Sequence, residues 1–292
     1  MFVIIGASGY LGSYLIKNVI DNTDEKVIAT YNSNISLVES SNSRVRWVKL
    51  DISDFLNVNN FCKQELGNDI KYKFIYLSSF IYPDEVEKNP KKAWNINVAS
   101  LDYFLSKAKD KIHSLYYSSG DSIYGESVND YIFNESDSYN PINTYGRTKA
   151  IAEQIVLMYG FSVIRYSLLM GPSLSSKKHF FDKIVESLKN KSNIDMFYDS
   201  RRSVIEFNSA ACFTIKLLEE RCYKKQDIIN ISSDTPLSKF EIALKIAKKL
   251  NLDSKYINST SMVNQSCRAR DILMSNQKLK GVLNLREIEF LN

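Results

Sequence analysis

The stretch that decides the fold is Phe2-Val3-Ile4-Ile5-Gly6-Ala7-Ser8-Gly9-Tyr10-Leu11-Gly12, at the start of the chain. Its four leading apolar residues are a run of the length of one buried strand, and the run ends at a glycine. Apolar residues then recur at helical spacing, with Leu11, Leu15 and Val19 on one face. The stretch therefore predicts a strand, a tight glycine turn and a helix.

The same alternation continues along the chain. Short apolar runs predict further strands at 27–30, 45–50, 74–77, 114–117 and 162–166, and helical stretches separate most of them. Short apolar strands that alternate with helices favour right-handed crossovers and a parallel sheet covered on both faces. We therefore predict an α/β fold built on a doubly wound parallel Rossmann sheet.

Beyond residue 167 the alternation is less regular. The pattern predicts helices over about 180–191 and 238–250 and strands over 204–207 and 228–231. Ser238, with Glu241 three residues later, is typical of a capping box at a helix start. We predict a dinucleotide-binding Rossmann domain over 1–167, to which segments near 204–231 return, and a smaller C-terminal α/β substrate lobe that makes up most of 168–292.

The composition is that of an ordinary soluble globular chain of 292 residues, 44% hydrophobic and 24% charged. Lys and Arg number 38 against 33 Asp and Glu, and the basic residues are spread in short groups, which is weak support for a nucleic-acid partner. A formal charge of +5 suits an anionic small ligand equally well. No segment reaches the roughly 20 apolar residues that span a bilayer, and the first residues do not resemble a leader, so we expect a cytoplasmic protein without a membrane partner.

Cysteine and histidine give no metal pattern. The chain has four widely spaced cysteines that match neither CxxC nor a zinc spacing, and two histidines that could supply imidazole: Cys62, Cys212, Cys222, Cys267, His113 and His179. We expect neither a metal site nor a disulfide framework.

The glycine turn carries the first chemistry. In a GxxGxxG turn between a strand and a helix, backbone N–H groups at the helix N-terminus can meet a pyrophosphate, and glycines permit its close approach. The same pattern also occurs in turns without a ligand, but its position directly after the first strand favours a dinucleotide site. The predicted contacts are Gly6, Ser8, Gly9, Tyr10, Leu11 and Gly12.

The ribose of such a cofactor is read near the end of the second strand, where an acidic residue would hold a 2′-hydroxyl. This chain has Asn32 and Ser33 there, with no carboxylate to repel a 2′-phosphate and no Arg to bind one. The residues favour NADP(H) somewhat over NAD(H) and leave both open.

Tyr145 and Lys149 stand four apart at the start of a helical stretch, so both side chains project from one face. A phenol has a pKa of about 10, and a nearby ammonium together with an oxidised nicotinamide can lower it toward neutrality. Tyr145 would then act as the general acid/base. An isolated YxxxK is more often a surface Tyr and Lys, and the glycine turn upstream is what favours catalysis.

Together these motifs resemble the extended short-chain dehydrogenase/reductase family, in particular its nucleotide-sugar epimerases, dehydratases and 4-ketoreductases. The resemblance covers nearly the whole chain and includes a structural asparagine at Asn97 and the segments at 118–125, 140–144 and 165–172. It implies further cofactor contacts at Asp51, Ile52, Leu77 and Ser78.

The family's third catalytic group is a Ser or Thr four residues before Tyr124, where this chain has Gly120. By resemblance to relatives that tolerate glycine there, Ser122 supplies the hydroxyl, and Ser119 is the other candidate. The alternative is that these serines only fill a strand-end turn. Asp121 could add an acid/base or bind substrate.

The resemblance also implies substrate-binding arginines in the C-terminal lobe. Arg202 matches the arginine that precedes a strand of the family's substrate lobe. Arg268 and Arg270 match a late region whose arginine binds the substrate pyrophosphate, which a rigid fork can hold bidentately. The alternative for each is a solvated surface arginine. The aspartate-containing stretch that follows the first arginine in the family is lost here.

The leading hypothesis is an NAD(P)H-dependent reductase of a nucleotide-linked 4-keto sugar, such as the dTDP-4-dehydrorhamnose reductases of the family. In this hypothesis Tyr145 and Lys149 also contact the cofactor, and Lys149 orients its ribose and biases the phenol. The first alternative is a nucleotide-sugar 4-epimerase with tightly bound NAD, and a dehydratase ranks third. An alternative of another class is a non-catalytic NAD(P)-binding subunit. The resemblance further implies a homodimer formed through the helix that bears Tyr145 and the one near 97–109.

Overall fold

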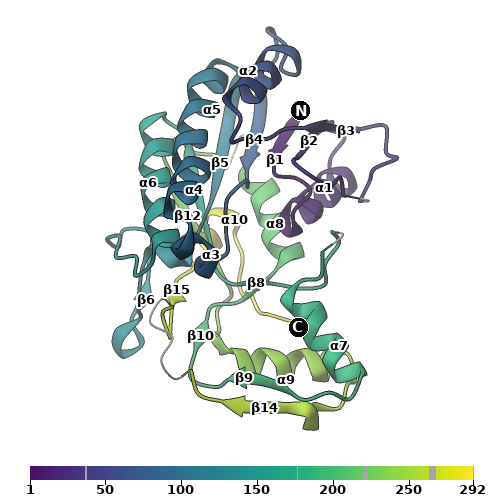
Figure 1. The fold of residues 1–292 in the computed structure, drawn as a ribbon, viewed down its shortest axis with the longest axis vertical. Coiled ribbons are helices and arrows are strands. Elements are labelled where there is room, and N and C mark those ends of the chain that lie inside the picture. The colour runs from purple at the N-terminus through teal and green to yellow at the C-terminus, as the bar shows by residue number, and fades with distance from the viewer. Residues whose placement is uncertain (37, 176, 220–222, 263–267, 292) are drawn as a thin grey trace.

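The structure, a computed structural model, describes residues 1–36, 38–175, 177–219, 223–262 and 268–291. Its centre is a parallel sheet of seven strands in the order β12-β7-β5-β4-β1-β2-β3 (Figure 1). The predicted doubly wound α/β fold is confirmed. The strands are β1 (Phe2–Ile5), β2 (Val27–Tyr31), β3 (Val45–Lys49), β4 (Tyr72–Tyr76), β5 (Ile112–Gly120), β7 (Ser162–Tyr166) and β12 (Ile228–Ile231).

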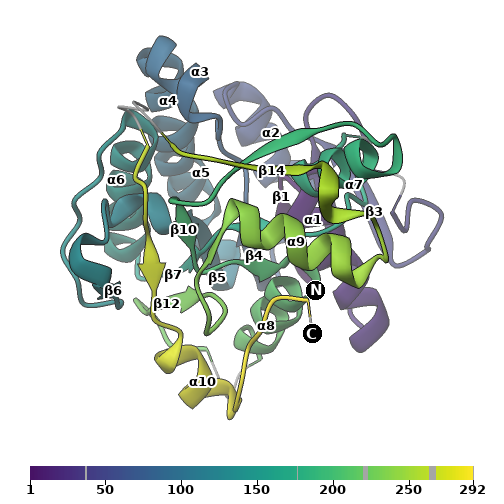
Figure 2. The same ribbon diagram turned by 90° about the horizontal axis from the view of Figure 1, so that it is seen from below.

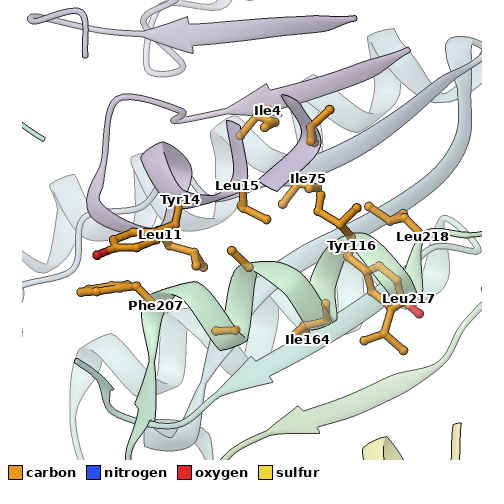
Figure 3. Close-up of a cluster of buried hydrophobic side chains, with 14 of the residues drawn as sticks. Ile4, Leu11, Tyr14, Leu15, Ile75, Tyr116, Ile164, Phe207, Leu217 and Leu218 are labelled. Carbon is orange, nitrogen blue, oxygen red and sulfur yellow. The ribbon is translucent and has the colours of Figure 1, made fainter. Parts of the chain in front are cut away.

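Helices cover both faces of this sheet (Figure 1). One face packs against α1 (Tyr10–Asn22) and α8 (Phe207–Leu217), and the other against α2 (Phe55–Gln64), α5 (Ser100–Ala108) and α6 (Thr144–Met158). Side chains alternate along β1, so that Ile4 joins the first core and Val3 the second. Figure 3 shows the first core, in which Leu11 and Tyr14 of α1 meet Phe207 of α8.

Short elements connect the sheet to its surroundings. They are α3 (Pro83–Lys88), α4 (Pro90–Trp94), the π-helical turn η1 (Asn95–Ala99), the 3₁₀ turns η2 (Lys109–Lys111), η3 (Asp121–Ile123) and η4 (Val128–Asp130), and the two-residue strands β6 (Ile132–Phe133), β8 (Leu169–Met170), β11 (Ile205–Glu206) and β15 (Leu273–Met274). The helix α10 (Gln277–Leu283) packs against β12.

A smaller lobe lies beyond the carboxyl ends of the sheet, at the bottom of Figure 1 and toward the viewer in Figure 2. It has its own apolar core, which includes Ile184, Met196 and Ile242. The lobe contains α7 (Phe180–Lys189), β9 (Ile194–Phe197), β10 (Arg201–Arg202), β13 (Leu237–Ser238), α9 (Lys239–Lys249), η5 (Ser254–Tyr256) and β14 (Ile257–Thr260). Ser238 and Glu241 form the predicted capping box.

The strands predicted at 204–207 and 114–117 differ from the structure. The strand expected at 204–207 is reduced to the two residues of β11, because Phe207 already begins α8. Phe207, Ala210, Ala211 and Thr214 are buried at helical spacing, and packing against α1 decides the helix. The strand expected at 114–117 is longer and runs to Gly120.

Within the described residues, no helix is long and apolar enough to cross a membrane, and no group of metal-ligating side chains gathers. Cys62 and Cys212 carry free thiols. Cys222 and Cys267 lie outside the described residues.

Candidate functional site

A cavity of about 910 Å³ opens at the carboxyl ends of the sheet strands. One of its walls lies beside β1 and β4, between which the strand order reverses, and this is the usual position of a ligand crevice in such sheets. Most of the predicted site residues line this one cavity: Gly6, Ser8, Gly9, Tyr10, Leu11, Gly12, Asn32, Ser33, Asp51, Ile52, Leu77, Ser78, Ser119, Asp121, Ser122, Tyr145 and Arg202. Lys149, Arg268 and Arg270 are not part of the lining, although Lys149 Nζ donates to the carbonyl of the lining residue Ser118 (2.7 Å).

The glycine turn leaves the start of α1 open to the cavity. Gly6 has a positive φ of 84°, and a Cβ at Gly12 would overlap the carbonyl of Ala7, so the backbone can pack this closely only without side chains. The N-cap Gly9 makes no side-chain hydrogen bond, and the first turn of the helix has no acidic residue. The uncapped, positively polarised N-terminus fits a pyrophosphate.

The outer end of the cavity is polar. Asn32 and Ser33 are exposed at the end of β2. The Asp51 carboxylate accepts hydrogen bonds from the backbone N (2.9 Å) and the hydroxyl (2.6 Å) of Ser53, so it is held in a local turn. Two lining cations, Lys92 and Lys177, were not predicted, because they lie on segments that carry no local motif.

Asn97 joins two walls of the site, as expected of a structural asparagine. Its side-chain oxygen accepts from the Ser79 hydroxyl (2.9 Å) and the Phe80 backbone N (2.7 Å). Its side-chain nitrogen donates to the Phe80 carbonyl (3.1 Å) and to the Thr148 hydroxyl (3.0 Å). The residue therefore fixes the end of β4 against α6.

The start of α6 carries Tyr145 and Lys149 on one face. Asn143 caps the helix by accepting a hydrogen bond from Gly146 N (2.8 Å). Lys149 is 2% exposed, and its Nζ donates to the Tyr117 hydroxyl (3.0 Å) and the Ser118 carbonyl (2.7 Å). Burial lowers the pKa of Lys149 to about 7.

Tyr145 differs from the expectation in one respect. Burial raises the pKa of its phenol above the ordinary value, and the nearby Asp121 carboxylate raises it further. The Lys149 ammonium lies 5.9 Å from the centre of the Tyr145 ring and does not reverse this shift. In the protein alone, the phenol therefore holds its proton at neutral pH.

The residues of the predicted hydroxyls line the same cavity as Tyr145. The Oγ atoms of Ser119 and Ser122 are buried, and neither has a hydrogen-bond partner among the described residues. Buried polar groups normally have a partner, so these hydroxyls suit a polar ligand atom. Asp121 lies between them and the lobe, with a carboxylate oxygen 3.6 Å from Nε of Arg202, and burial raises its pKa.

The three predicted arginines are engaged within the protein. Arg202 donates to the carbonyls of Arg201 (2.8 Å), Ala269 (2.8 Å) and Arg270 (2.6 Å). Arg268 pairs with Asp84 of α3 (2.6 Å), and Arg270 lies 3.4 Å from Asp199. Of the three, only Arg202 faces the cavity.

The sequence interpretation missed a buried ion pair behind the site. Glu153 and Arg165 are 0% and 1% exposed, and a guanidinium nitrogen lies 2.7 Å from the carboxylate. A signal was present, because Tyr145, Lys149 and Glu153 follow one another at intervals of four residues on one helix face.

Comparisons with known proteins agree with this architecture. The chain matches the family described as "RmlD substrate binding domain" over residues 1–290. It is 26% identical over 264 residues to methionine adenosyltransferase 2 subunit beta of Xenopus tropicalis, covering 87% of this chain and 73% of the relative.

Two solved structures illustrate the likeness in fold. A hypothetical dTDP-4-dehydrorhamnose reductase from Sulfolobus tokodaii has a TM-score of 0.81 and 24% identity, over 99% of this chain and 97% of that one. UDP-glucuronic acid 4-epimerase from Bacillus cereus, in complex with UDP-glucuronic acid and NAD, has a TM-score of 0.82 and 19% identity, over 99% and 95% of the two chains.

Proposed function

The chain belongs to the family described as RmlD substrate binding domain, and from this premise we propose that it is an NAD(P)H-dependent reductase of a nucleotide-linked 4-keto sugar. The observation that carries the proposal is the state of Tyr145. Its phenol lines the cavity, and burial together with Asp121 keeps its pKa raised, so it is a proton donor at neutral pH. A reduction needs such a donor, because the carbonyl oxygen becomes an alkoxide as hydride arrives.

The cofactor site is part of this proposal. The open N-terminus of α1 would hold the pyrophosphate, and Asn32 and Ser33 would meet the ribose. When bound, the nicotinamide supplies hydride to the keto carbon. NAD in the Bacillus cereus 4-epimerase supports a nicotinamide cofactor here. The absence of a carboxylate at 32–34 keeps NADP(H) the favoured form.

The chain's own residues supply the remaining steps. Tyr145 donates its proton to the substrate oxygen, and Ser119 or Ser122 hydrogen-bonds that oxygen through a hydroxyl that has no partner within the described residues. Lys149, fixed by Tyr117 and Ser118, provides positive charge behind the phenol as its proton leaves. Arg202 contributes a cation on the lobe side.

Variants of Tyr145 test whether the protein is an enzyme at all. Tyr145→Phe should abolish reduction of a panel of UDP- and dTDP-linked 4-keto sugars, while NADP(H) affinity stays within about twofold. Tyr131→Phe is the matched control, because Tyr131 is exposed and its hydroxyl donates a hydrogen bond to Asp137. Full turnover by Tyr145→Phe would overturn the proposal.

A nucleotide-sugar 4-epimerase is the second candidate, supported by the fold of the Bacillus cereus enzyme. Mass spectrometry of the dinucleotide released on denaturation separates the two. Stoichiometric NAD would mean a cofactor regenerated in place and would favour the epimerase. An empty site or traces of NADP(H) would favour the reductase.

The likeness to methionine adenosyltransferase 2 subunit beta supports a third candidate, a cofactor-binding subunit without its own turnover.

A homodimer through α5 and α6 also stays a proposal. It is supported by exposed apolar side chains of α6, Ile151 (39%) and Met158 (73%). Sedimentation equilibrium of the wild type and of Met158→Lys tests the dimer.

A further inference from the structure

The inference starts from the buried Glu153–Arg165 pair. Glu153 lies in α6 and Arg165 in β7, and neither side chain is exposed. The guanidinium donates through Nε to both carboxylate oxygens (3.1 Å each) and through Nη2 to one of them (2.7 Å). The Tyr139 hydroxyl donates a further hydrogen bond to the carboxylate (2.9 Å). A charge pair buried this deeply costs desolvation free energy and is weak evidence for stability alone.

Tyr124 connects the Glu153–Arg165 pair to the turn that carries Asp121 and Ser122. Arg165 Nη1 donates to the Tyr124 hydroxyl (2.8 Å), which itself donates to Oδ1 of Asn230 (2.8 Å). Tyr124 directly follows η3, and its backbone N donates to the Asp121 carbonyl (3.0 Å). The turn that carries Asp121 and Ser122 is therefore tied to the ion pair.

The same pair lies one helical turn beyond Lys149. Tyr145, Lys149 and Glu153 share one face of α6, and a Cβ at Gly146 would overlap the Ser122 carbonyl, so this face packs directly against the turn. The α6 face that carries Tyr145 and Lys149 and the turn that carries Ser122 are therefore both connected to the buried Glu153–Arg165 pair.

The charges around Lys149 are few. The tyrosines Tyr117 of β5 and Tyr145 of α6 present their rings to its ammonium, at 4.5 Å and 5.9 Å from the ring centres. The carboxylate that acts on it is that of Glu153, which raises the pKa of Lys149 against the larger effect of burial. Across the centre, Asp121 acts on Tyr145.

We propose that Glu153, held by Arg165, is a positioning residue that favours the charged form of Lys149 and, through Tyr124, fixes the turn of Ser122 against α6. The inference rests on the proposed function for its effect on turnover, but its effect on Lys149 is independent of any activity. The pair acts through Lys149 and the turn and does not touch the substrate.

The charge effect is tested by the double variant Glu153→Gln/Arg165→Met. Replacing both members of a buried pair with neutral residues of similar size is often neutral for stability, whereas a single replacement would leave a buried charge alone. The NMR titration of the Lys149 side chain, assigned with Lys149→Arg, should move to lower pH by about one unit. The alkaline limb of kcat/KM should move with it. An unchanged midpoint in the folded double variant would overturn the charge role.

The positioning effect is tested by Tyr124→Phe, which keeps the ring stacked on Phe133 and leaves the ion pair in place. We expect kcat to fall at least tenfold while the Lys149 midpoint and NADP(H) affinity stay unchanged. An unchanged kcat would overturn the positioning role. The outcomes separate the two proposals: turnover by Tyr145→Phe contradicts the proposed function, whereas the Lys149 midpoint tests the charge role of the present inference without any turnover. If the double variant does not fold, Tyr124→Phe still decides the positioning role.

Discussion

At the residue scale, the backbone requires glycine at only one of the two nearby positions Gly120 and Gly125. Gly120 has φ −154° and ψ 173°, which any residue adopts, and an added Cβ would meet only the Tyr166 carbonyl at 3.6 Å. Gly125 has a φ of 90°, and an added Cβ would overlap the Asn140 carbonyl. The fold therefore requires glycine at 125 and not at 120.

Alanine variants test this difference. Gly120→Ala should leave the free energy of unfolding unchanged or raise it by about 0.4–1 kcal/mol, because alanine restricts the unfolded chain. Gly125→Ala, the matched control, should lower it by more than about 1 kcal/mol. Urea denaturation of both variants measures the difference, and equal losses would contradict the assignment.

The buried ammonium of Lys149 makes stability depend on pH. In the folded protein its pKa is lowered to about 7 from the ordinary 10.5, so between these values the unfolded chain binds more protons. Its contribution to stability is therefore lowest below pH 7 and rises with pH above it.

Lys149→Met should remove this contribution. Between pH 7 and 9, the rise in unfolding free energy with pH should be smaller in the variant by up to about 1.4 kcal/mol per pH unit, the value for one proton. Denaturant unfolding at several pH values gives both slopes. The slope, not the absolute stability, is the readout, because the variant also loses two hydrogen bonds. Equal slopes would mean that Lys149 titrates normally.

At the element scale, the cap of α6 connects helix stability to chemistry. Asn143→Ala removes the hydrogen bond from Gly146 N and should cost about 1 kcal/mol of unfolding free energy. The first turn carries Tyr145, so kcat should fall as well. Ser238→Ala removes the corresponding cap of α9, where Glu241 N donates at 3.1 Å, and should cost similar stability with kcat unchanged. Equal activity losses in both variants would argue for a global effect.

At the scale of the whole molecule, hydrogen bonds of Asp271 connect the lobe to the sheet domain. Its carboxylate accepts from Arg201 of β10, through the backbone N (2.7 Å) and Nε (3.0 Å). Its own backbone N donates to the Glu126 carboxylate (2.8 Å), and β15, which begins two residues later, pairs with β6.

Asp271→Ala should therefore loosen the lobe over the cavity. We expect KM for the proposed nucleotide-sugar substrate to rise about tenfold, equivalent to about 1.4 kcal/mol, while the Kd for NADP(H) stays constant, because the predicted cofactor contacts lie on the sheet domain. Steady-state kinetics and calorimetry give the two constants. Asp253→Ala, at an exposed local contact with Lys255, is the control, and a parallel loss of cofactor affinity would contradict the interpretation.

The local patterns of the chain determined much of this architecture. The strand, turn and helix of residues 2–22 follow from period and glycine spacing, because backbone geometry and side-chain alternation act over a few residues. The spacing of Tyr145 and Lys149 likewise brings them to one helix face. The apolar run from Val204 to Phe207 predicts a strand, but packing against α1 makes its last residue the start of a helix.

Only the tertiary structure decided the electrostatics of the site. The pairing of Glu153 with Arg165, the raised pKa of Tyr145 and the lowered pKa of Lys149 depend on burial by elements distant in sequence. The hydrogen bond from Arg268 to Asp84 joins residues that are 184 positions apart in the sequence. Sequence spacing fixes which side chains share a face, but desolvation and charge pairing depend on what covers that face, and this is set by the packing of the whole chain.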